Sequence, residues 1–129
     1  MILDTSAVIA VIREEVDSRR IVARLEAAGE IGIGTPTLTE SSLVLVGRYG
    51  PAGQAMLGRF LEENEVIDIP FDRGHWNLAA AAFMRYGKGR HPAALNYGDC
   101  MAYATAQIAA APLLFIGDDF SKTDVVAAI

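Results

Sequence analysis

The sequence predicts an α/β fold in which a largely parallel sheet is covered by helices on both faces. Three observations lead to this prediction. Short apolar runs that are typical of strands alternate with longer segments whose apolar residues recur at helical spacing. The run 113–116 is apolar throughout, as in strands that are buried on both faces. The chain has 129 residues, of which 52% are hydrophobic, so we expect one well-filled core and a single domain over residues 1–129.

Four short runs are predicted to be strands. The first ends abruptly at Asp4, and the last follows Pro112, which stops the helix before it. The predicted strands are residues 1–3, 30–34, 66–69 and 113–116. Because helical segments separate consecutive strands, we expect βαβ units with parallel pairing.

The segments between the strands are predicted to be mainly helical. After a compact apolar segment, 7–12, the predicted helices are 16–28, 36–49, 54–63, 72–86 and 97–110. Pro36 favours the first helical position, which makes Thr35 the expected cap. We expect His75 to lie exposed in the first turn of its helix. One stripe of the same helix is expected to pack on the sheet, and it consists of Trp76, Ala79, Ala80, Phe83 and Gly87.

Composition and charge narrow the classes of function. The net charge of -5 argues against a general affinity for nucleic acid, so any such binding needs a local basic surface. The single cysteine, Cys100, excludes a disulfide framework and a cysteine-based zinc site, so a metal would be oxygen-bound Mg²⁺ or Mn²⁺. No apolar run reaches the roughly 18 residues of a membrane span, and no signal-peptide pattern is present. We therefore expect a soluble, cytoplasmic protein that does not bind membranes.

Acidic residues stand at the predicted carboxyl ends of the strands or in the first turns of the helices that follow. Asp4 follows the first strand, Glu40 lies one turn into the next long helix, Asp99 opens the last helix, and Asp118 and Asp119 follow the last strand. In an open α/β sheet these positions converge on one edge. Two carboxylates about 4 Å apart repel by roughly 4 kcal/mol at an effective dielectric of about 20. The acids therefore predict a divalent cation between them.

Each acid also has an ordinary structural explanation. Asp4 fits a helix N-cap, and Glu40 closes the segment 37–40, which fits a capping box unless Thr35 is the cap. Asp99 closes the segment 96–99, another capping arrangement, and acids near helix N-termini are favoured by the helix dipole. One of the two acids after the last strand is expected to be such a cap. The residues alone leave these alternatives open.

Four motifs together resemble those of PIN-domain ribonucleases, and in particular of VapC-type toxins from type II toxin–antitoxin pairs. The similarity covers essentially the whole chain, and the order and separation of the motifs make it specific. The motifs are Ile2 to Ala7, Thr37 to Glu40, Leu95 to Cys100, and Leu113 to Phe120 followed by Thr123 and Asp124. The resemblance implies a Rossmann-like α/β/α sandwich with a mainly parallel sheet of four to five strands. It also implies metal-dependent endonucleolytic cleavage of RNA.

The resemblance assigns roles to the acids residue by residue. Asp4 and Asp99 match the family's metal-holding acids, with Mg²⁺ or Mn²⁺ as the implied cofactor. Glu40 matches the acid that completes the metal site or positions the attacking water. The fourth acid is assigned to Asp119, although the doublet with Asp118 leaves its register open. The implied mechanism is hydrolysis of the phosphodiester by a metal-activated water.

Supporting residues and partners are implied as well. Thr5 and Ser6 resemble hydroxyl residues that support the metal site, and Asp118 and Asp124 are outer candidates. The family resemblance implies a cognate VapB-type antitoxin that obstructs the acidic cleft, and a homodimer of toxins. The local basic surface that RNA binding requires is predicted in one loop, at Arg85, Lys88, Arg90 and His91.

Two other classes of function compete with the ribonuclease. A phosphatase of the haloacid dehalogenase type also begins with an acid at a strand end, but its second acid, two residues further on, is replaced here by Ser6. A non-catalytic, Rossmann-like binding module explains the fold but gives no reason for Glu40 and Asp99, and the sequence has no phosphate-binding glycine motif. We therefore expect the ribonuclease.

Overall fold

The computed structural model describes the whole chain, residues 1–129. The centre of the molecule is one parallel sheet, whose strands are β1 (Ile2–Leu3), β2 (Gly32–Gly34), β3 (Ile67–Ile69) and β4 (Leu113–Leu114). The strand order is β3-β2-β1-β4, so the first strand lies between the second and the last. The predicted α/β fold with a parallel sheet is confirmed, and its strands are shorter than predicted.

A single additional bridge lies where a fifth strand would be. Ala127 pairs with Leu113 in an isolated parallel bridge, and the backbone N–H of Ala128 donates to the carbonyl oxygen of Leu113 at 2.9 Å. The carbonyl of Ala128 in turn accepts a hydrogen bond from Nε of Arg24 at 2.7 Å. The sheet therefore has four strands, and one backbone bridge fixes the C-terminal segment against its edge.

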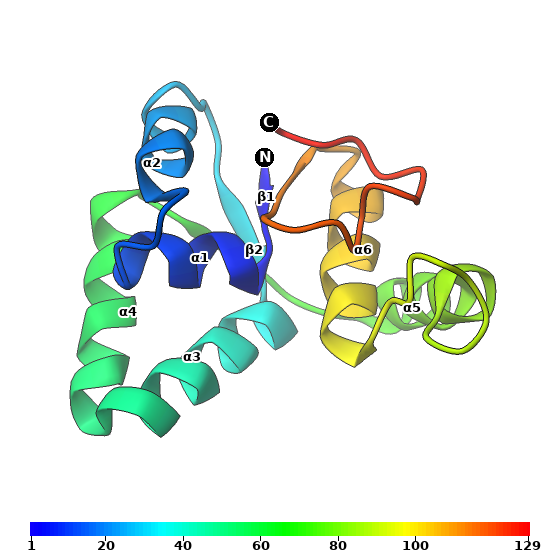
Figure 1. Cartoon of the computed structure of the whole chain (residues 1–129), viewed down its shortest axis with the longest axis horizontal. Helices are drawn as coiled ribbons and strands as arrows, with labels where there is room; N and C mark the ends of the chain where they lie inside the picture. Colours follow the sequence, from blue (N-terminus) through cyan, green and yellow to red (C-terminus); the bar gives the residue numbers. More distant parts are fainter.

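Six helices cover the sheet. They are α1 (Thr5–Ile12), α2 (Ser18–Glu26), α3 (Thr35–Tyr49), α4 (Pro51–Glu63), α5 (Arg73–Tyr86) and α6 (Tyr97–Ala109). Figure 1 shows α1 to α4 on one side of the sheet and α5 and α6 on the other. No helix combines the length and the apolar character that crossing a membrane requires. The molecule is thus a three-layered α/β/α sandwich.

Two buried apolar clusters hold the three layers together. Leu3 and Leu114 belong to the cluster on the side of α1 to α4, whereas Ile2 and Leu113 belong to the cluster on the side of α5 and α6. Adjacent strand residues therefore point to opposite faces, and all four are at most 3% exposed. Each such side chain contributes about 1.5–3 kcal/mol through burial. Burial on both faces explains why β1 and β4 consist of consecutive apolar residues.

Small residues allow α6 to lie directly against β2. A Cβ atom added to Gly34 would be 2.5 Å from Oγ1 of Thr105, which is buried and donates to the carbonyl of Met101 at 2.9 Å. Ala102 and Ala106 of the same helix are also buried. This close packing brings the first turn of α6 to the edge where the parallel strands end.

Predictions for α5 were wrong in two respects. The buried residues of this helix are His75, Ala79, Ala82 and Tyr86, whereas Trp76 is 60% exposed. His75 was expected in solvent, but it is 4% exposed because its ring stacks on Phe71 and its Nδ1 lies 2.9 Å from Oδ1 of Asp72. The helix packs on α6 rather than on the sheet, so a different face is buried.

The predicted cap of α3 was one residue out of register. Gly34 is the N-cap, so Thr35 is the first helical residue and Pro36 the second. Either of the first two positions suits proline, because neither N–H has a partner within the helix. Glu40 consequently lies well beyond the reach of a capping box.

Candidate active site

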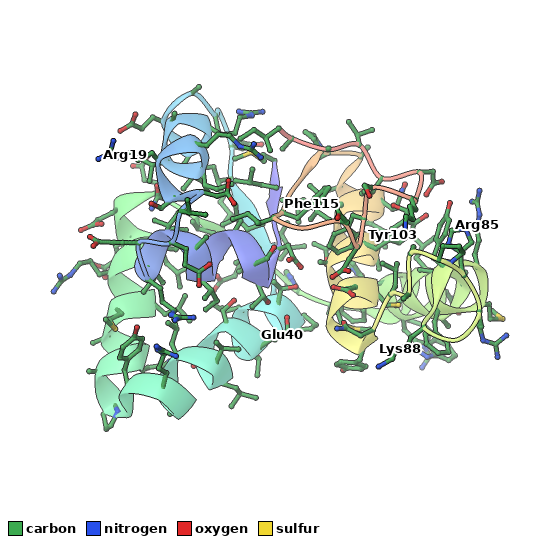
Figure 2. All side chains as sticks on the ribbon, viewed as in Figure 1. Arg19, Glu40, Arg85, Lys88, Tyr103 and Phe115 are labelled. Atoms are coloured by element: carbon green, nitrogen blue, oxygen red, sulfur yellow. The ribbon has the colours of Figure 1, made fainter.

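A cavity of about 330 Å³ opens at the carboxyl ends of β1 and β4. It is lined by five carboxylates and by no lysine, arginine or histidine. The acids are Asp4, Glu15, Glu40, Asp99 and Asp119. Figure 2 shows Glu40 between α3 and α6. The structure therefore brings together the four acids that the sequence analysis singled out, from positions spread over almost the whole chain.

Asp4 lies at the inner wall of the cavity and is 6% exposed. It is the N-cap of α1, and its Oδ2 accepts hydrogen bonds from the backbone N–H of Ser6 at 3.0 Å and from Oγ of Ser6 at 2.5 Å. Burial raises the pKa of Asp4, the bonds from Ser6 counteract this rise, and the charge of Glu40 adds to it. Asp4 is thus both a helix cap and a buried acid without a cationic partner.

Ser6 connects the ends of two strands. While its hydroxyl donates to Asp4, the same oxygen accepts a hydrogen bond from the backbone N–H of Ile116 at 3.0 Å. Ile116 follows β4, and Asp4 follows β1. The hydroxyl therefore fixes the position of the buried carboxylate relative to the segment that carries Asp119.

The carboxylate of Glu40 accepts a hydrogen bond from a hydroxyl of the neighbouring helix α1. Oγ1 of Thr5 donates to Oε1 of Glu40. The hydroxyl of Ser41 lies 3.5 Å from Oγ1 of Thr5 and donates to the carbonyl of Thr37 at 2.9 Å. Because α3 is capped at Gly34, the capping explanation for Glu40 does not apply. Its carboxylate instead lines the cavity.

The side chain of Asp99 both caps α6 and lines the acidic cavity. It forms the capping box of α6 with Asn96: its backbone N–H donates to Oδ1 of Asn96 at 2.9 Å, and its Oδ2 accepts from the backbone N–H of Asn96 at 3.0 Å. Its carboxylate also faces the cavity. Burial and the charges of Asp4, Asp119 and Glu40 raise its pKa from 3.8 to about 6, against the lowering effect of the Asn96 hydrogen bond.

The two consecutive acids after β4, Asp118 and Asp119, line different cavities. Asp119 lines the acidic cavity, whereas Asp118 lines a neighbouring cavity of about 550 Å³ together with Arg20. Gly117 has a φ of +100°, a conformation that favours glycine, and it turns the chain before the two acids. Asp119 thus lies with the other acids, whereas Asp118 does not, and the assignment of Asp119 as the fourth acid stays a prediction.

Asp124 does not reach the acidic cavity, contrary to its expected supporting position. It accepts a hydrogen bond from the hydroxyl of Tyr103 at 2.7 Å and lies 3.5 Å from Nη1 of Arg85. The hydrogen bond from Tyr103 is the main cause that lowers the pKa of Asp124. Its role in the structure is to hold the C-terminal segment against α5 and α6.

The predicted basic loop also lies away from the cavity. None of Arg85, Lys88, Arg90 and His91 lines it. In Figure 2, Arg85 and Lys88 lie near α5, separated from Glu40 by α6. The guanidinium groups of Arg85 and Arg90 lie 4.7 and 5.6 Å from the ring centres of Tyr86 and Phe83. The loop was expected beside the acids because it precedes α6 in the sequence. Arg85 and Lys88 instead lie on the side of α6 that faces away from Glu40.

Glu15 lines the cavity and was missed by the sequence analysis. It follows α1 and forms a salt bridge of 3.1 Å with Arg13. The preceding residue, Glu14, has a φ of +52°, so the chain reverses here and returns toward the strand ends. No periodicity marks such a turn, and a run of two acids after a helix is typical of exposed surface.

The donor groups of the cavity fit a hard divalent cation. They are carboxylates, the hydroxyl groups of Thr5 and Ser6 and the side-chain amide of Asn96, without histidine or cysteine, and Mg²⁺ and Mn²⁺ prefer such oxygen donors. No three of the acids lie close enough together to form a ready-made ligand cluster. An ion that is held by one or two carboxylates and keeps several waters, as Mg²⁺ usually is, does not require such a cluster.

Comparisons with known proteins identify the family and agree with the fold. The family model of the PIN domain matches residues 1–126. Ribonuclease VapC36 of Mycobacterium tuberculosis is 43% identical over 126 residues, covering 97% of this chain and 91% of the relative. Ribonuclease VapC of Mycolicibacterium smegmatis is 37% identical over 127 residues, covering 98% of both chains.

Two solved structures share the fold at low sequence identity. The crystal structure of Mycobacterium tuberculosis VapC20, a Sarcin-Ricin loop cleaving toxin, has a TM-score of 0.79 at 15% identity and covers 97% of this chain and 95% of its own. A toxin–antitoxin complex from Klebsiella pneumoniae has a TM-score of 0.72 at 21% identity and covers 99% of this chain and 97% of its own. With its family match and its relatives, this chain belongs to the PIN-domain family and, within it, to the VapC ribonucleases.

Proposed function

We propose that this protein is a metal-dependent endoribonuclease and the toxin of a toxin–antitoxin pair. The observation that carries the proposal is the acidic cavity of a VapC family member. Four carboxylates from distant parts of the chain line one cavity, and none of the four forms a salt bridge. Such an arrangement destabilises the metal-free protein and favours cation binding.

We assign the metal ligands to Asp4 and Asp99, with Asp119 completing the negative charge of the site. VapC nucleases of the PIN-domain family generally depend on a divalent metal, and we propose Mg²⁺ or Mn²⁺ for this chain. When bound, the cation lowers the pKa of an attacking water and neutralises charge that develops on the phosphate. Ser6 holds the carboxylate of Asp4 by its hydroxyl and backbone N–H.

Glu40 is assigned to orient the attacking water. Its carboxylate is fixed by the hydroxyl of Thr5, and both residues line the cavity. A fixed acceptor for one water proton aligns the oxygen lone pair with the phosphorus atom, which is a positioning contribution to catalysis. Fixing Glu40 is therefore the supporting role that we propose for Thr5.

RNA must be attracted by groups outside the cavity, because no cationic side chain lines it. We propose Lys88 and Arg90 of the basic loop for this role, since both are exposed and neither forms a salt bridge. Arg85 is shared with Asp124, and His91 accepts a hydrogen bond from the backbone N–H of Ala93 at 3.0 Å. Arg85 and His91 are therefore weaker candidates for phosphate binding.

We further propose a cognate VapB-type antitoxin and a homodimer as partners. Exposed apolar side chains on α3 support this: Leu43 is 68% exposed, and Val44, which lines the acidic cavity, is 43% exposed. Among the neighbours in fold are a Klebsiella pneumoniae toxin–antitoxin complex and VapBC2 of Rickettsia felis bound to a promoter DNA fragment. Binding of a purified antitoxin is expected to inhibit RNA cleavage at an equimolar ratio.

The function is tested by comparing two substrates. The protein is incubated with a structured RNA or with p-nitrophenyl phosphate, in Mn²⁺, in Mg²⁺ or in EDTA. We expect cleavage of RNA with either metal, none in EDTA, and no release of p-nitrophenol. Hydrolysis of p-nitrophenyl phosphate alone would identify a phosphatase. Metal binding without either activity would identify a non-catalytic binding module, and both results contradict the proposal.

A further inference from the structure

Gly98 lies directly against the carboxylate of Glu40. A Cβ atom added at this position would be 2.8 Å from Cδ and 2.9 Å from Oε1 of Glu40, and closer still to Oε2. Gly98 is the second residue of α6 and precedes Asp99. The first turn of α6 therefore approaches Glu40 so closely that only a residue without a side chain leaves the carboxylate in its place.

The carboxylate of Glu40 has a second neighbour, the hydroxyl of Thr5. Oγ1 of Thr5 donates to Oε1 of Glu40, and it lies 3.5 Å from the hydroxyl of Ser41, which donates to the carbonyl of Thr37 at 2.9 Å. Ser41 and Thr37 are buried. Glu40 thus contacts a hydroxyl of α1 and lies directly against Gly98 of α6.

A methyl group at position 98 would displace the side chain of Glu40 rather than the helix. The atoms it meets are the end of a flexible side chain, and Glu40 is partly exposed and borders open cavity. The backbone of α6, in contrast, is fixed by its capping box and by tight packing at Thr105. Alanine is also a better helix former than glycine. Gly98→Ala should therefore preserve or raise the stability of the fold while it displaces the carboxylate of Glu40.

We propose that Gly98 is a positioning residue for Glu40. Its lack of a side chain sets the place of the Glu40 carboxylate in the acidic cavity, across from Asp99. The inference rests on the proposed function, because it assumes that the place of this carboxylate matters for metal and water. It predicts that a side chain at position 98 weakens metal binding and catalysis by displacing Glu40, while the fold stays intact.

The test compares Gly98→Ala with a matched control, Gly58→Ala. Gly58 is an exposed residue of α4 with nothing within 4 Å of an added Cβ, so it gains the same helix propensity without any contact. Both variants are expected to melt at or above the wild-type temperature without metal. For Gly98→Ala we expect Mn²⁺ affinity to fall about tenfold by isothermal titration calorimetry. We also expect its kcat on RNA to fall about tenfold or more, with neither value changed in Gly58→Ala.

A second background shows whether the effect passes through Glu40. In Glu40→Ala, the added methyl group at position 98 has no carboxylate to displace, so Gly98→Ala should cause no further loss of Mn²⁺ affinity. An equal loss in both backgrounds would overturn the proposal, as would a lower melting temperature or wild-type Mn²⁺ affinity and kcat in Gly98→Ala. If the wild-type protein cleaves no RNA, the proposed function fails, and the Mn²⁺ measurements alone decide the role of Gly98.

Discussion

Replacing Asp99 by asparagine is expected to stabilise the metal-free protein near neutral pH. The structure raises the pKa of Asp99 from 3.8 to about 6 through burial and through the charges of the neighbouring acids. Ionisation of this carboxyl is therefore less favourable in the folded protein than in the unfolded chain. Asparagine has nearly the same shape, and its Oδ1 can still accept the hydrogen bond from the backbone N–H of Asn96.

The size of the effect follows from the pKa change. A tenfold change in a protonation equilibrium corresponds to about 1.4 kcal/mol, so the full penalty above pH 6 is about 3 kcal/mol. Asp99 is partly exposed, and solvent screening reduces this value to about 1.5–2 kcal/mol. Loss of a negative charge from the first turn of α6 offsets about 0.5 kcal/mol. We expect Asp99→Asn to be about 1 kcal/mol more stable than the wild type.

The pH dependence provides the control. Below pH 3.8 Asp99 is protonated in both states and contributes no difference, and the penalty of the wild type grows as pH rises through about 6. Urea unfolding in EDTA should therefore show the full difference at about pH 7.5 and roughly a third of it at about pH 4.5. A variant that is no more stable than the wild type at about pH 7.5 would refute the claim that Asp99 is destabilised by its surroundings.

Three further predictions follow from the site and the core. Asp4→Asn should abolish RNA cleavage without changing the far-ultraviolet circular dichroism spectrum; full activity would exclude Asp4 from the metal site. Saturating Mn²⁺ should raise the melting temperature of the wild type but not of Asp4→Asn, because only a bound ligand stabilises the fold; equal shifts would locate the metal elsewhere. Gly34→Ala should destabilise the protein by about 1–3 kcal/mol in urea unfolding, because its methyl group meets Thr105, whereas Gly29→Ala, with nothing within 4 Å, should not.

The order of the elements was predictable from the sequence because the strands and most helices carry strong local signals. Pro36 and Gly50 mark the start and end of α3, and the apolar runs mark β1 and β4. The buried face of α5 was not predictable, because Trp76 and Ala79 fit an apolar stripe as well as Ala79 and Ala82 do. Which stripe is buried depends on the partner helix, and that partner is α6 rather than the sheet.

The four acids of the cavity were predictable because parallel strands bring their carboxyl ends to one edge. The residues that surround these acids were not predictable, because they come close only through turns and packing that leave no periodic pattern in the sequence. Glu15 enters the cavity through a chain reversal, and Asp124 and the basic loop follow a path away from it. The contact of Gly98 with Glu40 joins residues far apart in the sequence, and a glycine in a helix N-terminus gives no sign of what its missing side chain makes room for.

The central place of β1 in the sheet has a consequence for the order in which the acidic cavity is assembled. Among the four strands, β1 is synthesised before the others, but its neighbour in the sheet, β4, is synthesised after them. Asp119 follows β4, so it joins Asp4 in the acidic cavity only after these two strands have paired. Because pairing of distant segments is slow, we expect assembly of the acidic cavity to be a late step of folding.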